Sequence, residues 1–106
     1  MRIVIVDGNA PDRAMIEQAV TQMNMKNAYG ITYALAGAAA DGKEGYEMIR
    51  AANPDLIIMD MQLPRMKGLS MLKRVRDENI KSRVILLTAD RDFKAAQQAI
   101  GLAVDD

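Results

Sequence analysis

The sequence predicts an α/β fold in which a parallel β-sheet is covered by helices on both faces. Short, continuous apolar runs are typical of strands that are buried on both faces. Each of four such runs is followed by a segment with the apolar spacing of a helix, and this alternation produces right-handed βαβ units with parallel strands. The chain has 106 residues, of which 50% are hydrophobic, so it is long enough for one domain with one core.

Four segments are expected to be strands because each is a short run of β-branched or aliphatic residues. They are RIVIV at 2–6, ITYALAG at 31–37, DLIIM at 55–59 and RVILL at 83–87. The carboxyl ends of parallel strands meet at one edge of the sheet, where ligands bind in such folds. The first, third and fourth strands are followed at this edge by Asp7, Asp60 and Thr88. The second strand has no polar residue at its end.

Four helices are expected after these strands, over residues 11–24, 42–52, 67–79 and 90–101. The first opens on Pro11, which suits the first turn of a helix. It has one apolar stripe at four-residue spacing, which we expect to be part of the core. That stripe is Met15, Ala19 and Met23, with Ile16 and Val20 beside it. The apolar faces of the other three helices are Tyr46, Ile49 and Ala52; Leu69, Leu72 and Val75; and Phe93, Ala96 and Ile100.

The composition excludes several classes of function. Fourteen basic residues balance 14 acidic residues, so no overall charge attracts nucleic acid or an anionic membrane. The absence of cysteine and histidine excludes disulfides, thiolate metal sites and the commonest general base. No apolar run approaches the roughly 20 residues that span a bilayer. We therefore expect a cytoplasmic domain with oxygen ligands and carboxylate chemistry.

The strand ends predict a site for a cation and a phosphate. If the first, third and fourth strands are neighbours, about 5 Å apart, two carboxylates and one hydroxyl converge in one crevice. Mg²⁺ takes one or two carboxylates together with carbonyl oxygens, waters and phosphate, and a carboxylate can itself be phosphorylated. A lone strand-end aspartate is as often a helix cap, and Thr88 can serve β-propensity alone. The prediction therefore depends on the three residues together.

Three segments in order carry a resemblance to a known family. They are IVIVDGNAPDR, AAADGKEGYEMIRAANPDLIIMDMQLPRMKG and VILLTAD, and they resemble the receiver domain of two-component response regulators. The most specific part runs from Asn53 to Gly68, where a strand ends on Asp and is followed by Pro and then Met-x-Gly. The resemblance implies a flavodoxin-like three-layer sandwich with strand order 2-1-3-4-5.

The resemblance also implies a role for each site residue. Asp60 matches the phospho-acceptor, which takes a phosphoryl group from a sensor histidine kinase. Mg²⁺ would be held by Asp7, Asp60 and the backbone carbonyl of Gln62, and the Thr88 hydroxyl would contact the phosphoryl group. This implies a signalling domain rather than an enzyme, apart from catalysis of its own aspartyl phosphorylation and dephosphorylation. Such receivers are often attached to DNA-binding output domains that regulate transcription.

One departure from the family pattern affects the metal site. Gly8 stands where the family usually has a second acidic residue, so we expect weakened Mg²⁺ binding. Asn9 and Asp12 are close enough in sequence to contribute an oxygen, although Asp12 is expected to cap the helix. An alternative is therefore a pseudo-receiver that acts as a phosphorylation-independent interaction module. A flavin-binding electron carrier on the same fold is excluded, because residues 7–13 contain no Ser or Thr for a phosphate loop.

The second departure is at the carboxyl end. The family pattern continues with an aromatic strand residue, a strand-end lysine and a fifth helix, so we expect residues 1–106 to be a receiver that is truncated before its fifth strand. Residues 83–87 would then form an edge strand whose unpaired backbone can bind another chain. We therefore expect either a homodimer through the exposed edge and face or a much lower stability than that of a chain with the fifth strand and helix.

Overall fold

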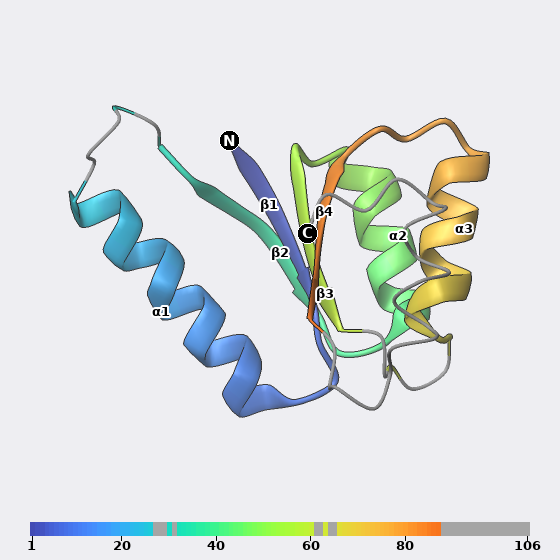
Figure 1. Cartoon of the computed structure of the whole chain (residues 1–106), viewed down its shortest axis with the longest axis horizontal. Helices are drawn as coiled ribbons and strands as arrows, with labels where there is room; N and C mark the ends of the chain where they lie inside the picture. The colour runs from blue at the N-terminus through green and yellow to red at the C-terminus, as the bar shows by residue number, and fades with distance from the viewer. Residues whose placement is uncertain (27–29, 31, 61–62, 64–65, 88–106) are drawn as a thin grey trace.

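A parallel sheet lies between two layers of helices (Figure 1). The computed structural model describes residues 1–26, 30, 32–60, 63 and 66–87. In this part of the chain the sheet has four strands in the order β2-β1-β3-β4. Helix α1 lies on one face, and α2 and α3 lie on the other. The flavodoxin-like α/β prediction is confirmed for these elements, whereas the helix expected over 90–101 lies outside the described residues.

Three strands lie within one residue of their predicted positions. They are β1 (Arg2–Val6), β3 (Leu56–Asp60) and β4 (Arg83–Leu87). In the register of the sheet, Val6 pairs with Met59, and Asp60 pairs with Leu87. All three strands therefore end at the same edge of the sheet, as the sequence predicted.

Strand β2 covers Ala34–Ala39, so the prediction of 31–37 began three residues too early and ended two residues too early. Alanines have low β-propensity and gave no local signal that the strand continues. Pairing with β1 imposes the extended conformation, with an irregular register between Ile3 and Val4. The second strand still ends on an apolar residue, since Ala39 is followed by Ala40.

Helix α1 (Ala10–Lys26) packs on the sheet with only part of the apolar stripe that we predicted. Val20 is buried and Ile16 is half-buried, and both pack with Ile3 and Ile5 of β1. Met15, Ala19 and Met23 are exposed, so their assignment to the core was wrong. The rows Met15–Ala19–Met23 and Ile16–Val20 are one residue apart in sequence, which is about 100° around the helix, so four-residue spacing did not decide which row faces the sheet.

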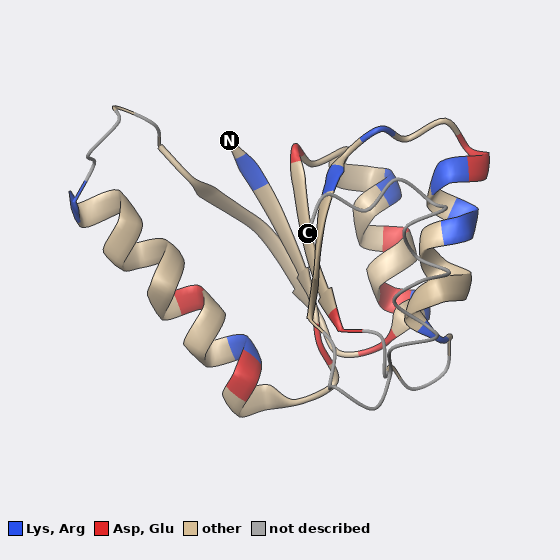
Figure 2. Cartoon of the chain, in the orientation of Figure 1, with Lys and Arg blue, Asp and Glu red and all other residues tan. Residues whose placement is uncertain are grey.

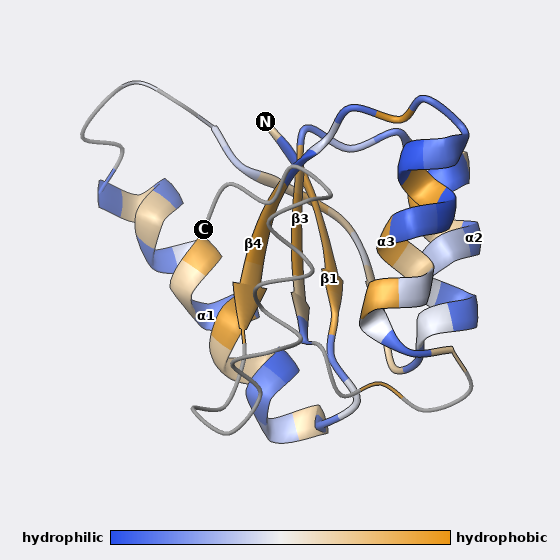
Figure 3. Ribbon diagram, turned by 45° about the vertical axis from the view of Figure 1, so that its right-hand side comes forward, coloured by the Kyte–Doolittle hydropathy of each residue, from blue (hydrophilic) through white to orange (hydrophobic). Residues whose placement is uncertain are grey.

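Helices α2 (Gly42–Ala52) and α3 (Gly68–Asp77) cover the opposite face of the sheet. Their predicted inward residues Tyr46, Ile49, Leu72 and Val75 are buried, whereas Ala52 and Leu69 are half-buried. The strands that they cover are mostly hydrophobic (Figure 3). The core on this side also includes Val4, Val6, Ile57, Met59, Met71 and Val84.

A polar cluster links the carboxyl-terminal part of α2 to the carboxyl-terminal part of α3. The Tyr46 hydroxyl donates a hydrogen bond to Glu78, and Arg50 Nε lies 3.4 Å from the same carboxylate. The guanidinium of Arg74 lies 4.3 Å from the centroid of the Tyr46 ring, a cation–π geometry.

None of the helices in the described ranges is long and apolar enough to cross a membrane.

Candidate functional site

Asp7 and Asp60 occupy adjacent positions at the carboxyl edge of the sheet. Val6 pairs with Met59 across β1 and β3, so the next residue of each strand is an aspartate. Figure 2 shows acidic positions, in red, near this edge of the sheet. The structure therefore brings together two of the predicted site residues. Gln62 and Thr88 lie outside the described residues, so their positions stay predictions.

Asp7 is a buried carboxylate, with 2% of its surface exposed. Its Oδ1 accepts a hydrogen bond from the Asn9 N–H at 2.8 Å, and its backbone carbonyl accepts one from Arg13 at 2.6 Å. Burial raises the pKa of Asp7, and the negative charges of Asp60 and Asp12 raise it further, against the lowering effects of the Asn9 hydrogen bond and Arg13. A cation at this edge would relieve the burial cost and the repulsion.

The residue that caps α1 is Asn9 rather than Asp12. Asn9 Oδ1 accepts a hydrogen bond from the Asp12 N–H at 3.0 Å, three residues further on, as an N-cap does. The capping role that we predicted for Asp12 therefore belongs to Asn9. Asp12 lies in the first turn, where its charge suits the helix dipole.

Two adjacent carboxylates fit a Mg²⁺ ion, which in proteins takes one or two carboxylates and completes its shell with carbonyl oxygens, waters and phosphate. In the described ranges, no group of three or more His, Cys, Asp or Glu side chains is placed so that it could hold a metal ion. Gly8, which lies next to Asp7, is exposed and has no side chain to offer. The donor set thus fits a hard cation with few protein ligands.

Asp41 is a buried residue at the same edge of the sheet, and its role was not predicted from the sequence. It is 7% exposed and caps α2, where its Oδ1 accepts a hydrogen bond from the Glu44 N–H at 2.8 Å. An aspartate followed three residues later by glutamate is a capping-box pattern, which could have revealed it. The amino end of α2 is therefore fixed beside the strand ends.

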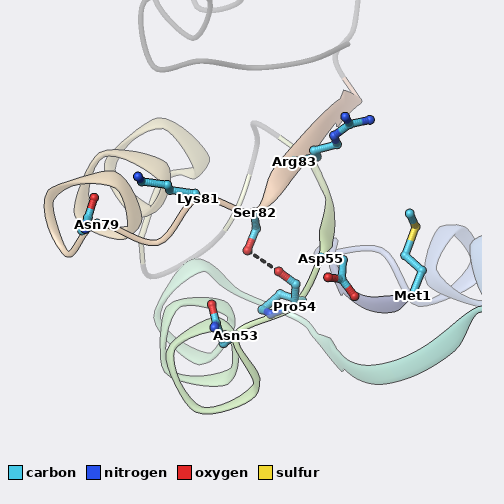
Figure 4. A pocket seen from close by; sticks show the side chains of 8 residues that line it. All are labelled: Met1, Asn53, Pro54, Asp55, Asn79, Lys81, Ser82 and Arg83. Atoms are coloured by element: carbon cyan, nitrogen blue, oxygen red, sulfur yellow. Dashed lines mark hydrogen bonds between the residues drawn. The ribbon is translucent and has the colours of Figure 1, made fainter.

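An open pocket lies at the opposite edge of the sheet, where β1, β3 and β4 begin (Figure 4). The Ser82 hydroxyl donates a hydrogen bond to the Pro54 carbonyl there. This pocket is separated from Asp7 and Asp60 by the length of the strands, so it is not part of the acidic site. Its lining residues are Met1, Asn53, Pro54, Asp55, Asn79, Lys81, Ser82 and Arg83.

Comparison with known proteins gives consistent matches. The family model of the response regulator receiver domain matches residues 3–106. The transcriptional regulatory protein DltR of Streptococcus agalactiae (serotype III, strain NEM316) is 31% identical over 106 residues, which are 100% of this chain and 43% of that protein. Protein CcdB of Bacillus subtilis (strain 168) is 30% identical over 105 residues, which are 99% of this chain and 81% of CcdB.

The solved structures agree with these sequence matches. The receiver domain of AraT, a response regulator from Geobacillus stearothermophilus, has a TM-score of 0.77 and is 28% identical, with 99% of this chain and 77% of that chain covered. The Francisella response regulator 1452 receiver domain has a TM-score of 0.71 at 28% identity, with 99% and 79% covered. The chain spans less than half the length of DltR.

Proposed function

This chain belongs to the response regulator receiver domain family, and on that premise we propose that it is a phosphorylation switch in which Asp60 accepts a phosphoryl group. The observation that supports this most is the position of Asp60. It ends the central strand β3, half-buried, beside the buried carboxylate of Asp7. A nucleophile in this place is held rigidly by a strand and still reaches the edge where ligands enter.

The proposed reaction is transfer from a phosphohistidine on a sensor kinase. A carboxylate oxygen of Asp60 attacks phosphorus, the bond from phosphorus to the histidine nitrogen breaks, and an acyl phosphate forms on Asp60. Asp7, Asp60 and the backbone carbonyl of Gln62 would hold Mg²⁺, which supplies positive charge to the phosphoryl oxygens. Asp7 keeps its orientation through the Asn9 N–H. The Thr88 hydroxyl would contact the phosphoryl group.

The consequence of phosphorylation would be a change of surface that an attached output domain reads. DltR is described as a transcriptional regulatory protein, and this chain matches 43% of it. We propose that the output is likewise transcriptional, through a DNA-binding domain, since the chain has no excess of basic residues with which to bind DNA itself.

The experiment is labelling with a small acyl phosphate or a phosphorylated histidine kinase in the presence of Mg²⁺. Wild type should form a hydroxylamine-sensitive phosphoprotein, and Asp60→Asn should not. Asp55→Asn is the matched control, because Asp55 immediately precedes the same strand at its opposite end and should leave labelling unchanged. Labelling that survives in Asp60→Asn would show that another residue is the acceptor.

Gly8 favours one alternative function, that of an interaction module which works without phosphorylation, because a usual carboxylate is missing beside Asp7. The labelling experiment separates the two. If wild type is never labelled and Gly8→Asp gains labelling, the loss of that carboxylate has disabled the switch and the alternative is favoured.

A further inference from the structure

The amino end of α2 makes an unusually close contact with the connection between β3 and α3. A β carbon built on Gly42 would lie 1.8 Å from the carbonyl oxygen of Met66 and 2.7 Å from its carbonyl carbon. Real β carbons essentially never approach another atom to less than 3.0 Å. The atoms that would clash belong to the backbone and cannot rotate away, so any side chain at residue 42 must displace Met66.

This contact lies in a connection that begins at Asp60. The connection runs from Asp60, the end of β3, to Gly68, the start of α3, and Gln62 lies within it. Leu63 in the same connection is only 8% exposed and belongs to the core. The connection is therefore attached at Leu63 by packing and at Met66 by the contact with Gly42.

The backbone that leads to Gly42 is also connected to the acidic site. Gly42 follows Asp41, the buried residue that caps α2. Just before it, the Ala39 carbonyl at the end of β2 accepts a hydrogen bond from the Asp7 N–H at 3.0 Å. The contact between Gly42 and Met66 thus joins the backbone beside Asp7 to the backbone that follows Asp60.

We propose that Gly42 is a positioning residue for the phosphorylation site, an inference that rests on the function proposed above. Because Gly42 has no side chain, the amino end of α2 holds Met66 close, and this contact and the buried Leu63 anchor the connection that follows Asp60. Asp60 is thereby held relative to Asp7 for the cation and the phosphoryl group. A displacement of about 1 Å at such a site can reduce the rate about a hundredfold.

Gly45 provides a matched control on the same helix. A β carbon at Gly45 would lie 2.7 Å from Val6 Cγ1 and 3.1 Å from Met71 Sδ, which are core side chains. Gly45→Ala therefore adds the same methyl group, but its nearest neighbours are core side chains rather than the Met66 backbone. Gly37→Ala is a milder control, because its methyl group would meet the flexible thioether of Met48 at 2.2 Å.

The first test measures the rate of phosphorylation by acetyl phosphate and the Mg²⁺ dissociation constant, at a temperature where all variants are folded. Gly42→Ala should lower the rate by about tenfold to a hundredfold and weaken Mg²⁺ binding. Gly45→Ala should lower the denaturation midpoint and leave the rate and the Mg²⁺ affinity of the folded protein unchanged. Equal effects of the two variants on the rate would overturn the proposal.

The second test does not require phosphorylation. In amide NMR spectra of the metal-free protein, Gly42→Ala should shift the Asp60 and Met66 resonances more than Gly45→Ala does. An absence of these shifts overturns the positioning role, whereas an absence of labelling in wild type overturns the proposed function instead. If Gly42→Ala does not fold, Mg²⁺ and beryllofluoride are added to wild type. The Gly42 amide resonance should then shift more than the Gly45 amide resonance. A larger shift at Gly45 would refute the positioning role of Gly42.

Discussion

Replacing Asp7 by Asn removes a negative charge that the folded chain buries. Asp7 is 2% exposed, and its Oδ1 accepts the Asn9 N–H at 2.8 Å, a hydrogen bond that the amide oxygen of Asn can keep. Burial raises the pKa of Asp7 above the ordinary value of 3.8, and the charges of Asp60 and Asp12 add to this. The ionised form of Asp7 is therefore less favourable in the folded chain than in the unfolded chain.

The direction of the pH dependence follows from the raised pKa of Asp7. Between the unfolded pKa of 3.8 and the higher folded pKa, the folded chain binds more protons than the unfolded chain. The free energy of unfolding of the metal-free protein should thus fall as pH rises through this window, and the loss is complete above the folded pKa. Each unit by which burial and the neighbouring charges raise the pKa of Asp7 lowers the free energy of unfolding by about 1.4 kcal/mol at neutral pH. Asp7→Asn should remove this destabilisation.

The assay is urea denaturation of wild type and Asp7→Asn without Mg²⁺, at neutral pH and again near the unfolded pKa. The Asn variant should have the higher midpoint at neutral pH, and the gap should close in acid. Asp55→Asn, at the far end of β3, controls for the loss of a charge elsewhere. Saturating Mg²⁺ should reverse the order, because a cation that binds the folded wild type stabilises it. A variant that is equal to or less stable than wild type at neutral pH would refute the reasoning.

Three further substitutions test individual parts of the account. Gly8→Asp adds a carboxylate beside Asp7, so it should tighten Mg²⁺ binding in calorimetric titration and lower the stability of the metal-free protein; unchanged affinity would mean that another group already fills the ligand position. Asn9→Ala removes the cap of α1 and should cost about 1 kcal/mol in urea denaturation; an unchanged midpoint would contradict the capping role. Tyr46→Phe removes the hydroxyl that bonds to Glu78 and should also cost about 1 kcal/mol. The same change in a Glu78→Gln background should cost less, and equal costs would show that the two residues are not coupled.

The strands could be predicted where a local apolar run coincided with a strand. β1 and β4 have the predicted bounds, and the pairing of Val6 with Met59 follows from the order 2-1-3-4. The end of β2 could not be predicted, because Ala38 and Ala39 have little local preference for a strand and pairing with β1 decides their conformation. Similarly, periodicity showed that one side of α1 is apolar, but only packing on Ile3 and Ile5 selects the stripe of Ile16 and Val20.

The site was predictable as far as it depends on strand ends. Asp7 and Asp60 are adjacent because parallel neighbours end together, which the sequence could indicate without any contact information. The roles of Asn9 and Asp41 depend on which residue begins each helix, and this is the least certain feature of a sequence pattern. The contact of Gly42 with Met66 joins residues that are 24 positions apart, and no local pattern reports it.

The most direct test of the central claim is to locate the phosphoryl group after reaction with an acyl phosphate and Mg²⁺. Reduction of the acyl phosphate with borohydride, followed by proteolysis and mass spectrometry, marks the modified residue itself. We expect a single modified position, Asp60, and a loss of modification in Asp60→Asn but not in Asp55→Asn. Modification at Asp7 or Asp12 with Asp60 untouched would contradict this expectation, because the end of β3 would then not carry the reactive carboxylate.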